Sequence, residues 1–231
     1  MGAEPGASPM SRLLLVVLFA VLGGVAHADS FDDLVACGER EREPAERLTF
    51  CTRFLEAPDQ IPYRRAMAME FRGRAYLDLD DDLAAAERDL TECLNLQVGL
   101  EMKAFCHGTR GDVRMRAGDF SGALADYDAW IPAWAQMSPD SGSAIYQRGM
   151  AYQALGETEK AIADFGEALR RDRRAVYYDA RGRAYSHRAK GDDVERAVAD
   201  FRTVIYLLRG TPNSPEALAA KQALRDLGVK P

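Results

Sequence analysis

Four copies of one short pattern limit what this chain can fold into. Each copy begins with an Arg-Gly pair and continues, one helix length later, with an Ala-x-x-Asp-hydrophobe run. The Arg-Gly pairs occupy 72–73, 110–111, 148–149 and 181–182, and the later runs occupy 86–90, 123–127, 161–165 and 197–201. The glycines are therefore 38, 38 and 33 residues apart. A period of this size indicates an array of stacked helical hairpins, a solenoid.

The residues within the pattern suit close helix packing. Small residues such as Gly149 and Ala161 are expected where two helices cross, because a larger side chain would push the backbones apart. Aromatic residues such as Tyr152 and Phe165 are expected to fill the space beside the crossing. The predicted fold class is all-α, a solenoid of antiparallel helix pairs.

The copy around Gly149 carries a fuller signature, which comprises Gly149, Tyr152, Gly156, Ala161, Phe165 and Ala168. This set resembles the tetratricopeptide repeat, and the resemblance extends over roughly residues 60–210. It implies a right-handed superhelix of about four repeats. Two positions depart from the family pattern: Arg173 stands where a proline is usual, and Arg114 replaces an aromatic residue.

Residues 1–28 are predicted to be a cleaved signal peptide. Arg12 precedes an apolar run at 13–26, and Ala26-His27-Ala28 supplies a small-x-small cleavage site. We expect cleavage after Ala28 and export to the bacterial periplasm; the alternative is an uncleaved anchor. The mature chain then resembles small exported tetratricopeptide-repeat proteins of alphaproteobacteria.

The rest of the chain divides into an array and its two ends. We expect a degenerate N-terminal helix pair at 29–58, the repeat array at 59–210, and a C-terminal capping helix and tail at 211–231. Pro215 and Gly228 would mark the start and end of the capping helix. Caps of this kind keep an open solenoid soluble.

The four cysteines are predicted to form two local disulfides, Cys37–Cys51 and Cys93–Cys106. Pro44 lies midway between the first two and Gly99 lies near the middle of the second two, and both read as turns between helices. Residues equidistant from such a turn face each other, as a disulfide requires. Three connectivities are possible, and four buried free thiols are the alternative.

The repeated Arg and Asp residues are predicted to form one ion pair in each repeat. The pairs are Arg72–Asp89, Arg110–Asp126, Arg148–Asp164 and Arg181–Asp200. Such a pair would fix the register of two helices more than it would add net stability. A ladder of arginines that binds anions is the alternative.

The family resemblance implies a function in binding other proteins. The first helices of the repeats would line a concave groove for a peptide or protein segment, and the groove residues would include Arg74, Phe105, Asp112, Tyr146, Met150, Asp179 and Arg183. Trp134 is a further interface candidate, because it follows Pro132 in what reads as a long connection. We expect a non-enzymatic scaffold in envelope assembly or maintenance, with a partner whose identity the sequence does not give.

Charge is uneven along the chain, although the net charge of −6 disfavours general nucleic-acid binding. A basic patch lies between residues 170 and 190, and its candidate residues are Arg170, Arg171, Arg173, Arg174, Arg188 and Lys190. Solvated helix faces are the simpler interpretation. Binding of an anionic envelope polymer is the functional alternative.

The sequence gives little evidence of catalysis or of metal binding. Common hydrolase and nucleotide-binding motifs are missing from the sequence, and no cofactor or metal is expected. Asp78, Asp80 and Asp82 match the start of a calcium loop, but Leu83 stands where that loop needs glycine. An enzyme that uses His187 or a redox-active cysteine pair is the weaker alternative.

Overall fold

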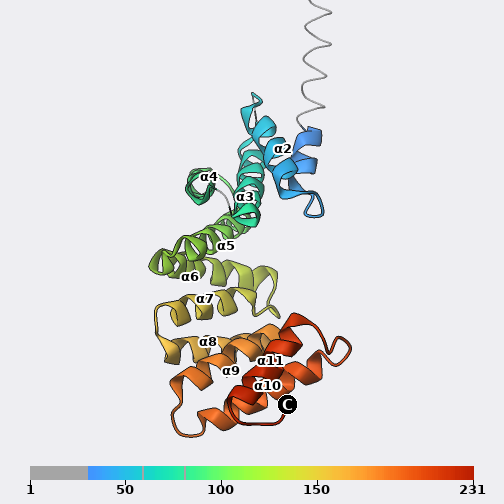
Figure 1. Ribbon diagram of the computed structural model, residues 1–231. Helices are drawn as coiled ribbons and strands as arrows, with labels where there is room; N and C mark the ends of the chain where they lie inside the picture. The colour runs from blue at the N-terminus through green and yellow to red at the C-terminus, as the bar shows by residue number, and fades with distance from the viewer. Residues whose placement is uncertain (1–30, 59, 81) are drawn as a thin grey trace, which may run out of the picture.

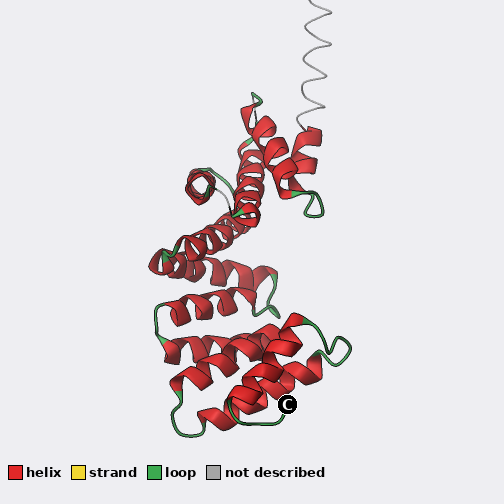
Figure 2. Ribbon diagram, viewed as in Figure 1, coloured by secondary structure: helices red, strands yellow, loops and turns green. Residues whose placement is uncertain are grey.

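The computed structural model describes residues 31–58, 60–80 and 82–231, and this part of the chain is built from helices without strands (Figure 2). Residues 31–38 are helical. The helices that follow are α2 (Pro44–Glu56), α3 (Pro62–Leu79), α4 (Leu83–Asn95), α5 (Leu100–Ala117), α6 (Phe120–Met137), α7 (Ser143–Ala154), α8 (Thr158–Arg171), α9 (Ala175–Arg188), α10 (Asp193–Leu207) and α11 (Pro215–Asp226).

Each helix packs against its neighbours in the sequence, so the helices form a row of antiparallel hairpins (Figure 1). The pairs α3–α4, α5–α6, α7–α8 and α9–α10 correspond to the four sequence copies. In Figure 1, α6, α7 and α8 lie nearly parallel, whereas α3 runs steeply across their direction. The helix direction therefore turns along the array, as in a superhelical solenoid.

The repeated glycines lie where paired helices come closest. A Cβ atom at Gly111 would approach the ring of Tyr127 to 2.5 Å, and one at Gly149 would approach the ring of Phe165 to 2.7 Å. Tyr127 and Phe165 are fully buried. In the later three copies the glycine and the aromatic residue thus form one packing unit, as the pattern predicts, and in the first copy Leu90 takes the place of the aromatic ring against Gly73.

A residue in the left-handed backbone conformation and a helix N-cap form the turn between α5 and α6. Gly118 has a φ of 83°, a conformation that favours glycine. The side chain of the next residue, Asp119, accepts a hydrogen bond from the backbone N–H of Gly122 at 2.9 Å and so caps α6. This turn reverses the chain within two residues.

Both ends of the described chain are closed by packing. At the C-terminal end, α11 starts with Ser214 as its cap and lies on α10, with Ala217, Ala220 and Leu224 buried beneath it. At the N-terminal end, residues 31–38 and α2 share an apolar core with α3, α4 and α5.

The predicted signal peptide lies outside the described residues. Among the helices that the structure describes, none has the length and apolar character needed to cross a membrane.

Candidate functional site

The odd-numbered helices form one continuous face of the array. Besides contacting their sequence neighbours, α3 contacts α5, α5 contacts α7, and α7 contacts α9. Helices that approach one another across an intervening helix lie on the inner side of a curved array. We call this surface the inner face, and the candidate groove residues of α3, α5, α7 and α9 belong to these helices.

Each repeat holds its two helices together through the arginine and aspartate that recur in the sequence. The separations are 2.6 Å for Arg72 Nε–Asp89 Oδ2, 2.8 Å for Arg110 Nη2–Asp126 Oδ1, 2.8 Å for Arg148 Nε–Asp164 Oδ2 and 2.8 Å for Arg181 Nη2–Asp200 Oδ1. All four carboxylates are buried. The four guanidinium groups are therefore already occupied, which disfavours the anion-ladder interpretation.

Three of these arginines also reach back to the preceding hairpin, a contact that the sequence analysis missed. Their Nη1 atoms lie 3.4 Å from Thr52 Oγ1 for Arg72, 3.0 Å from Thr91 Oγ1 for Arg110, and 2.9 Å from Asp128 Oδ1 for Arg148. Thr91 and Asp128 each stand two residues after a paired aspartate, and this regular spacing was the available signal. The arginines thus join neighbouring repeats as well as the two helices of one repeat.

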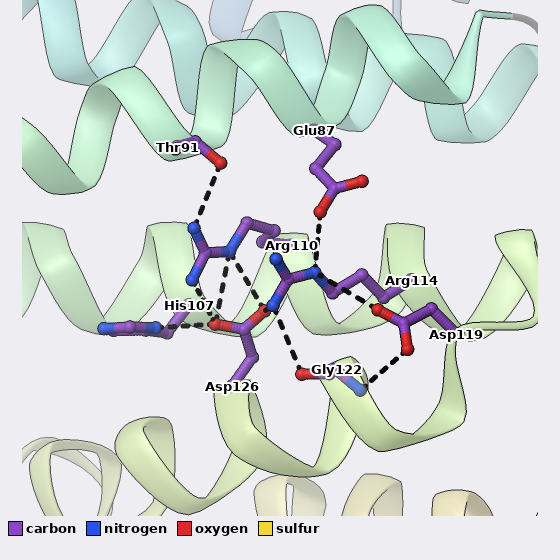
Figure 3. Close-up of polar contacts among 8 residues, drawn as sticks. All are labelled: Glu87, Thr91, His107, Arg110, Arg114, Asp119, Gly122 and Asp126. Carbon is purple, nitrogen blue, oxygen red and sulfur yellow. Dashed lines mark hydrogen bonds and ion pairs between the residues drawn. The ribbon is translucent and has the colours of Figure 1, made fainter.

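Asp126 is the most heavily bonded of the four aspartates (Figure 3). Its carboxylate lies 2.8 Å from Arg110 Nη2, 2.9 Å from Arg114 Nη1 and 2.8 Å from His107 Nδ1. Burial opposes ionisation, but the hydrogen bonds from His107 and Arg110 outweigh it and lower the pKa of Asp126. Arg114 also binds Glu87 of α4 at 2.8 Å. The arginine that departs from the family pattern therefore ties three helices together.

The groove candidates at the N-terminal end of the inner face lie in a polar network. Arg74 of α3 forms an ion pair with Glu70, and its Nη2 also lies 3.0 Å from Thr109 Oγ1 of α5. Glu70 is buried and accepts a second hydrogen bond, from Thr109, at 2.7 Å. The guanidinium of Arg74 is thereby fixed by Glu70 and Thr109.

A smaller cleft lies next to this network, between the end of α3 and helices α5, α6 and α7. Its volume is ≈ 440 Å³, and its lining residues are Leu77, Asp112, Met115, Arg116, Tyr127 and Gln147. Asp112 Oδ1 accepts hydrogen bonds from Tyr127 Oη at 2.8 Å and from Gln147 Nε2 at 3.0 Å. Burial raises the pKa of Asp112 despite these hydrogen bonds. We call this site the Asp112 cleft.

The groove candidates of α7 are partly packed. The ring of Tyr146 packs against those of Tyr177 and Phe165, with centroid distances of 4.8 Å and 5.8 Å. Met150 packs against a cluster that includes Ala161 and Phe165. These two side chains contribute as much to the core as to the inner face.

A second, larger cleft opens at the C-terminal end of the inner face. Its volume is ≈ 560 Å³, and it lies where α7, α9 and the capping helix α11 meet. Its lining combines polar and apolar side chains, among them Gln153, Arg183, Ala184, Ser186, His187, Ala223, Asp226 and Leu227. Arg183 is fixed by Asp179, with a Nε–Oδ2 distance of 2.7 Å. We call this site the C-terminal cleft.

The prediction that Trp134 lies in a long connection after Pro132 is wrong. Helix α6 continues through Pro132 to Met137, so Trp134 is helical and half-buried. Its ring lies 6.1 Å from that of Phe105 and 5.3 Å from that of Trp130. A proline removes one helical hydrogen bond, and we attribute the continuity of the helix to this aromatic packing. The contact also covers part of Phe105, a predicted groove residue.

The side chains of the predicted basic patch already have partners. These are Glu167 for Arg170 and Arg171, Tyr178 for Arg173, Tyr177 for Arg174, Asp193 for Arg188 and Glu159 for Lys190. The hydrogen bond from Arg188 lowers the pKa of Asp193 to about 2. Most of these charges therefore face a carboxylate, which weakens the positive field of the patch.

The cysteines lie in the two pairings predicted from the sequence. The Sγ atoms are 2.02 Å apart for Cys37–Cys51 and 1.93 Å apart for Cys93–Cys106, and all four residues are fully buried. The first pair links residues 31–38 to α2, and the second links α4 to α5. Closing loops of 14 and 13 residues stabilises a fold by about 3 kcal/mol each.

The aspartates of the calcium-like motif have separate structural contacts. Asp78 pairs with the buried Arg47 of α2, and Asp80 lies 2.9 Å from Arg116. Asp82 caps α4 by accepting a hydrogen bond from the backbone N–H of Ala85. Within the described residues, no cluster of three or more His, Cys, Asp or Glu side chains has an arrangement that suits a metal ion.

Comparisons with known proteins agree with this architecture. Residues 142–175 match the family described as "Tetratricopeptide repeat", and this stretch contains the copy with Gly149 and Phe165. The comparison with curated proteins gave no match.

Solved structures share the fold at low sequence identity. MamA (residues 41 to the end) from Desulfovibrio magneticus RS-1 is 21% identical with a TM-score of 0.62, and the match covers 81% of this chain and 96% of that one. TTC0263, described as a thermophilic TPR protein in Thermus thermophilus, is 18% identical with a TM-score of 0.60 and coverages of 79% and 91%. YrrB, described as a TPR protein with an unusual peptide-binding site, is 19% identical with a TM-score of 0.56 and coverages of 78% and 84%. The chain therefore contains a tetratricopeptide repeat and has the all-helical solenoid fold of tetratricopeptide-repeat proteins.

Proposed function

We propose that this protein is an exported, non-enzymatic scaffold that binds a segment of a partner protein along its inner face. The observation that carries the proposal is the C-terminal cleft, an open space of ≈ 560 Å³ on the inner helices. It offers apolar contacts from Ala223 and Leu227 beside polar ones from Arg183 and His187. A peptide needs both kinds of contact, because apolar burial supplies affinity and polar groups fix orientation.

The fold relatives support this function by analogy only. YrrB is described as having a peptide-binding site, and its helices are arranged like those of this chain. The rigid framework of arginine–aspartate pairs suits a scaffold, because it holds the inner helices in place before a partner binds. Preorganisation of this kind reduces the entropy lost on binding.

The alternatives from the sequence receive less support. A polymer-binding patch needs uncompensated positive charge, whereas Arg188 and Lys190 already face carboxylates. A redox enzyme needs an accessible cysteine, whereas all four cysteines are fully buried. The function that we propose is therefore that of a binding module, and a role in envelope assembly or maintenance is part of the same proposal.

Site-specific photo-crosslinking in the native cell tests the binding face. Tyr146 is unsuitable for the crosslinker, because its ring is packed against two others. We would place the crosslinker at His187, which is exposed in the C-terminal cleft, and for comparison at Arg202, which is exposed on the even-numbered helix α10. We expect a defined protein to be captured from His187 alone. Capture from Arg202 alone, or from neither position, would overturn the proposal.

Cell fractionation tests the proposed export. The full chain should appear in the periplasmic fraction, shortened at its N-terminus by cleavage after Ala28. A chain that lacks residues 1–28 should stay in the cytoplasm. Recovery of the uncleaved full chain in the cytoplasm would contradict this part of the proposal.

A further inference from the structure

The carboxylate of Asp112 is bonded on one side only. Both of its hydrogen bonds, from Tyr127 and Gln147, reach the same oxygen, Oδ1. Oδ2 has no partner among the described residues, and it is not among the unpartnered side-chain atoms that are sealed from solvent. An ionised carboxylate accepts about four hydrogen bonds through its two oxygens. Asp112 therefore presents an accessible oxygen, with free acceptor capacity, to the cleft that it lines.

The positive charges near Asp112 are already paired with other acids. Arg74 acts on Asp112 through space, but its guanidinium is bonded to Glu70 and Thr109. Arg116 lines the same cleft, and its Nη1 lies 2.9 Å from Asp80 Oδ1. Asp112, in contrast, is bonded only to neutral donors. The Asp112 cleft therefore holds one uncompensated negative charge.

The shape of the cleft suits a long side chain that ends in a cation. Leu77 and Met115 line it with apolar surface, and Asp112 supplies the charge. Lysine and arginine carry an aliphatic stem below a charged head, and such stems pack well on apolar side chains. A buried carboxylate that has lost part of its hydration also gains more from a cation than an exposed one does.

We propose that the Asp112 cleft binds a basic side chain of the partner segment, with Asp112 Oδ2 as its acceptor and Leu77 and Met115 against its stem. This inference rests on the proposed function, because it assigns the chemistry of one anchor of the segment bound on the inner face. It requires the partner to carry an arginine or a lysine at the position that reaches between α3, α5 and α7.

A peptide selection followed by matched affinities tests the proposal. The probe is a phage-displayed library of random peptides of about twelve residues, a length that spans several repeats, selected on the purified full chain. A selected peptide is then made in two forms, one with arginine and one with citrulline, which keeps the shape and removes the charge. Both forms are titrated against the wild-type protein, Asp112→Asn and Asp128→Asn by fluorescence anisotropy. Asp128→Asn is the matched control, because it removes a carboxylate that is exposed on α6 and bonded to Arg148.

We expect selected peptides to be enriched in arginine or lysine. Asp112→Asn should weaken binding of the arginine peptide by about tenfold or more, and Asp128→Asn by less than about threefold. The citrulline peptide should bind wild type and Asp112→Asn equally, because the charge that Asp112 recognises is gone. The citrulline exchange leaves the protein untouched, so a folding defect in the variant cannot imitate this result.

Three results would overturn the inference, and the first two separate it from the proposed function. Peptides that bind the inner face without basic enrichment, or that lose affinity equally in both variants, would contradict the basic anchor and leave the scaffold function standing. If no peptide is selected and crosslinking captures nothing from His187, the scaffold function and the inference fail together.

Discussion

Two aspartates of the second repeat, the half-buried Asp112 on α5 and the buried Asp126 on α6, show how one protein uses carboxylates in opposite ways. Asp126 is surrounded by two guanidinium groups and an imidazole, and its pKa is lowered. Asp112 is bonded to a phenol and an amide, and its pKa is raised. Asp126 is fully buried and Asp112 is half-buried, and burial acts to raise the pKa of both, so the bonded partners decide the direction of the shift.

The difference lies in charge compensation. A buried carboxylate that has cations on it stays ionised and joins the elements that supply those cations. A carboxylate that has only neutral donors retains an unbalanced charge, which a ligand can balance. We therefore interpret the Asp126 cluster as structural and the Asp112 cleft as a binding site.

The largest effect is expected from Asp126→Asn. The substitution leaves Arg110 and Arg114 close together without the carboxylate that balances them, and breaking a buried ion pair in this way costs about 3–5 kcal/mol. Urea unfolding followed by far-UV circular dichroism, with the disulfides intact, measures the loss of unfolding free energy. The exposed neighbour variant Asp128→Asn is the control. A loss below about 1 kcal/mol for Asp126→Asn would contradict the structural role.

The pH dependence of this loss has a definite sign. The folded pKa of Asp126 lies below its ordinary value of 3.8, so its stabilisation is fully present above that value. It disappears as the pH falls through the folded pKa. The difference in unfolding free energy between wild type and Asp126→Asn should therefore be constant near neutral pH and become smaller below pH 3.8. If this difference in unfolding free energy grows as the pH falls below 3.8, ionised Asp126 is not the group that stabilises the fold.

Arg114→Met should have a smaller effect than Asp126→Asn. It removes one of the partners of Asp126 and leaves Arg110 and His107, and it also frees Glu87. Losing a charged hydrogen bond of this kind costs about 1.5–3 kcal/mol. Arg116→Met makes the same chemical change at a half-exposed position and should cost less than about 1 kcal/mol. Equal losses in the two variants, again from urea unfolding, would show that the Asp126 cluster does not depend on Arg114.

The sequence predicts the recurring contacts of this protein better than the singular ones. The pairing of Arg148 with Asp164 is visible because both members recur in every copy. The second guanidinium on Asp126 comes from Arg114, which occurs once and reads only as a departure from the family. No repetition marks it, and only the three-dimensional structure brings it to Asp126.

Contacts across repeats were hard to predict for a related reason. Arg110 reaches Thr91 of the preceding hairpin, and the signal for this in the sequence is a single spacing: Thr91 follows Asp89 by two residues, as Asp128 follows Asp126. The sequence misplaces Trp134 because Pro132 indicates the end of a helix, whereas tertiary packing overrides local propensity there. The Asp112 cleft depends on Tyr127 and Gln147 from two further helices, which no local pattern brings together.

Asp112→Asn should change stability by less than about 1 kcal/mol, and in the stabilising direction near neutral pH. The asparagine oxygen still accepts hydrogen bonds from Tyr127 and Gln147, and the cost of a buried charge is removed. Because the folded pKa of Asp112 is raised above 3.8, that cost is present above the folded pKa. It vanishes as the pH falls to 3.8 and below. If Asp112→Asn lost as much unfolding free energy as Asp126→Asn, Asp112 would be a structural residue and the two sites would not differ.

The smallest effect on stability, and the sharpest test of the contrast, is expected from Asp80→Asn. Asp80 has a φ of 52°, a conformation that asparagine also tolerates, and its ion pair with Arg116 is exposed, so the loss should stay within about 0.5 kcal/mol. Arg116 lies four residues after Asp112 on the same helix, at a spacing that favours an ion pair. Once released from Asp80, Arg116 should turn toward Asp112 and supply the missing charge.

This variant should therefore keep its stability and lose affinity for the arginine peptide several-fold. The double variant Asp80→Asn with Arg116→Gln is the matched control, because it removes the competing guanidinium and should restore binding. Fluorescence anisotropy with the arginine and citrulline peptides measures both effects. If Asp80→Asn binds the arginine peptide as tightly as wild type, the charge of Asp112 does not govern recognition. If Asp80→Asn binds the arginine peptide weakly and the double variant restores binding, Arg116 has compensated the charge of Asp112. Asp112 then resembles Asp126, whose charge is balanced by internal cations, and it no longer binds a ligand cation.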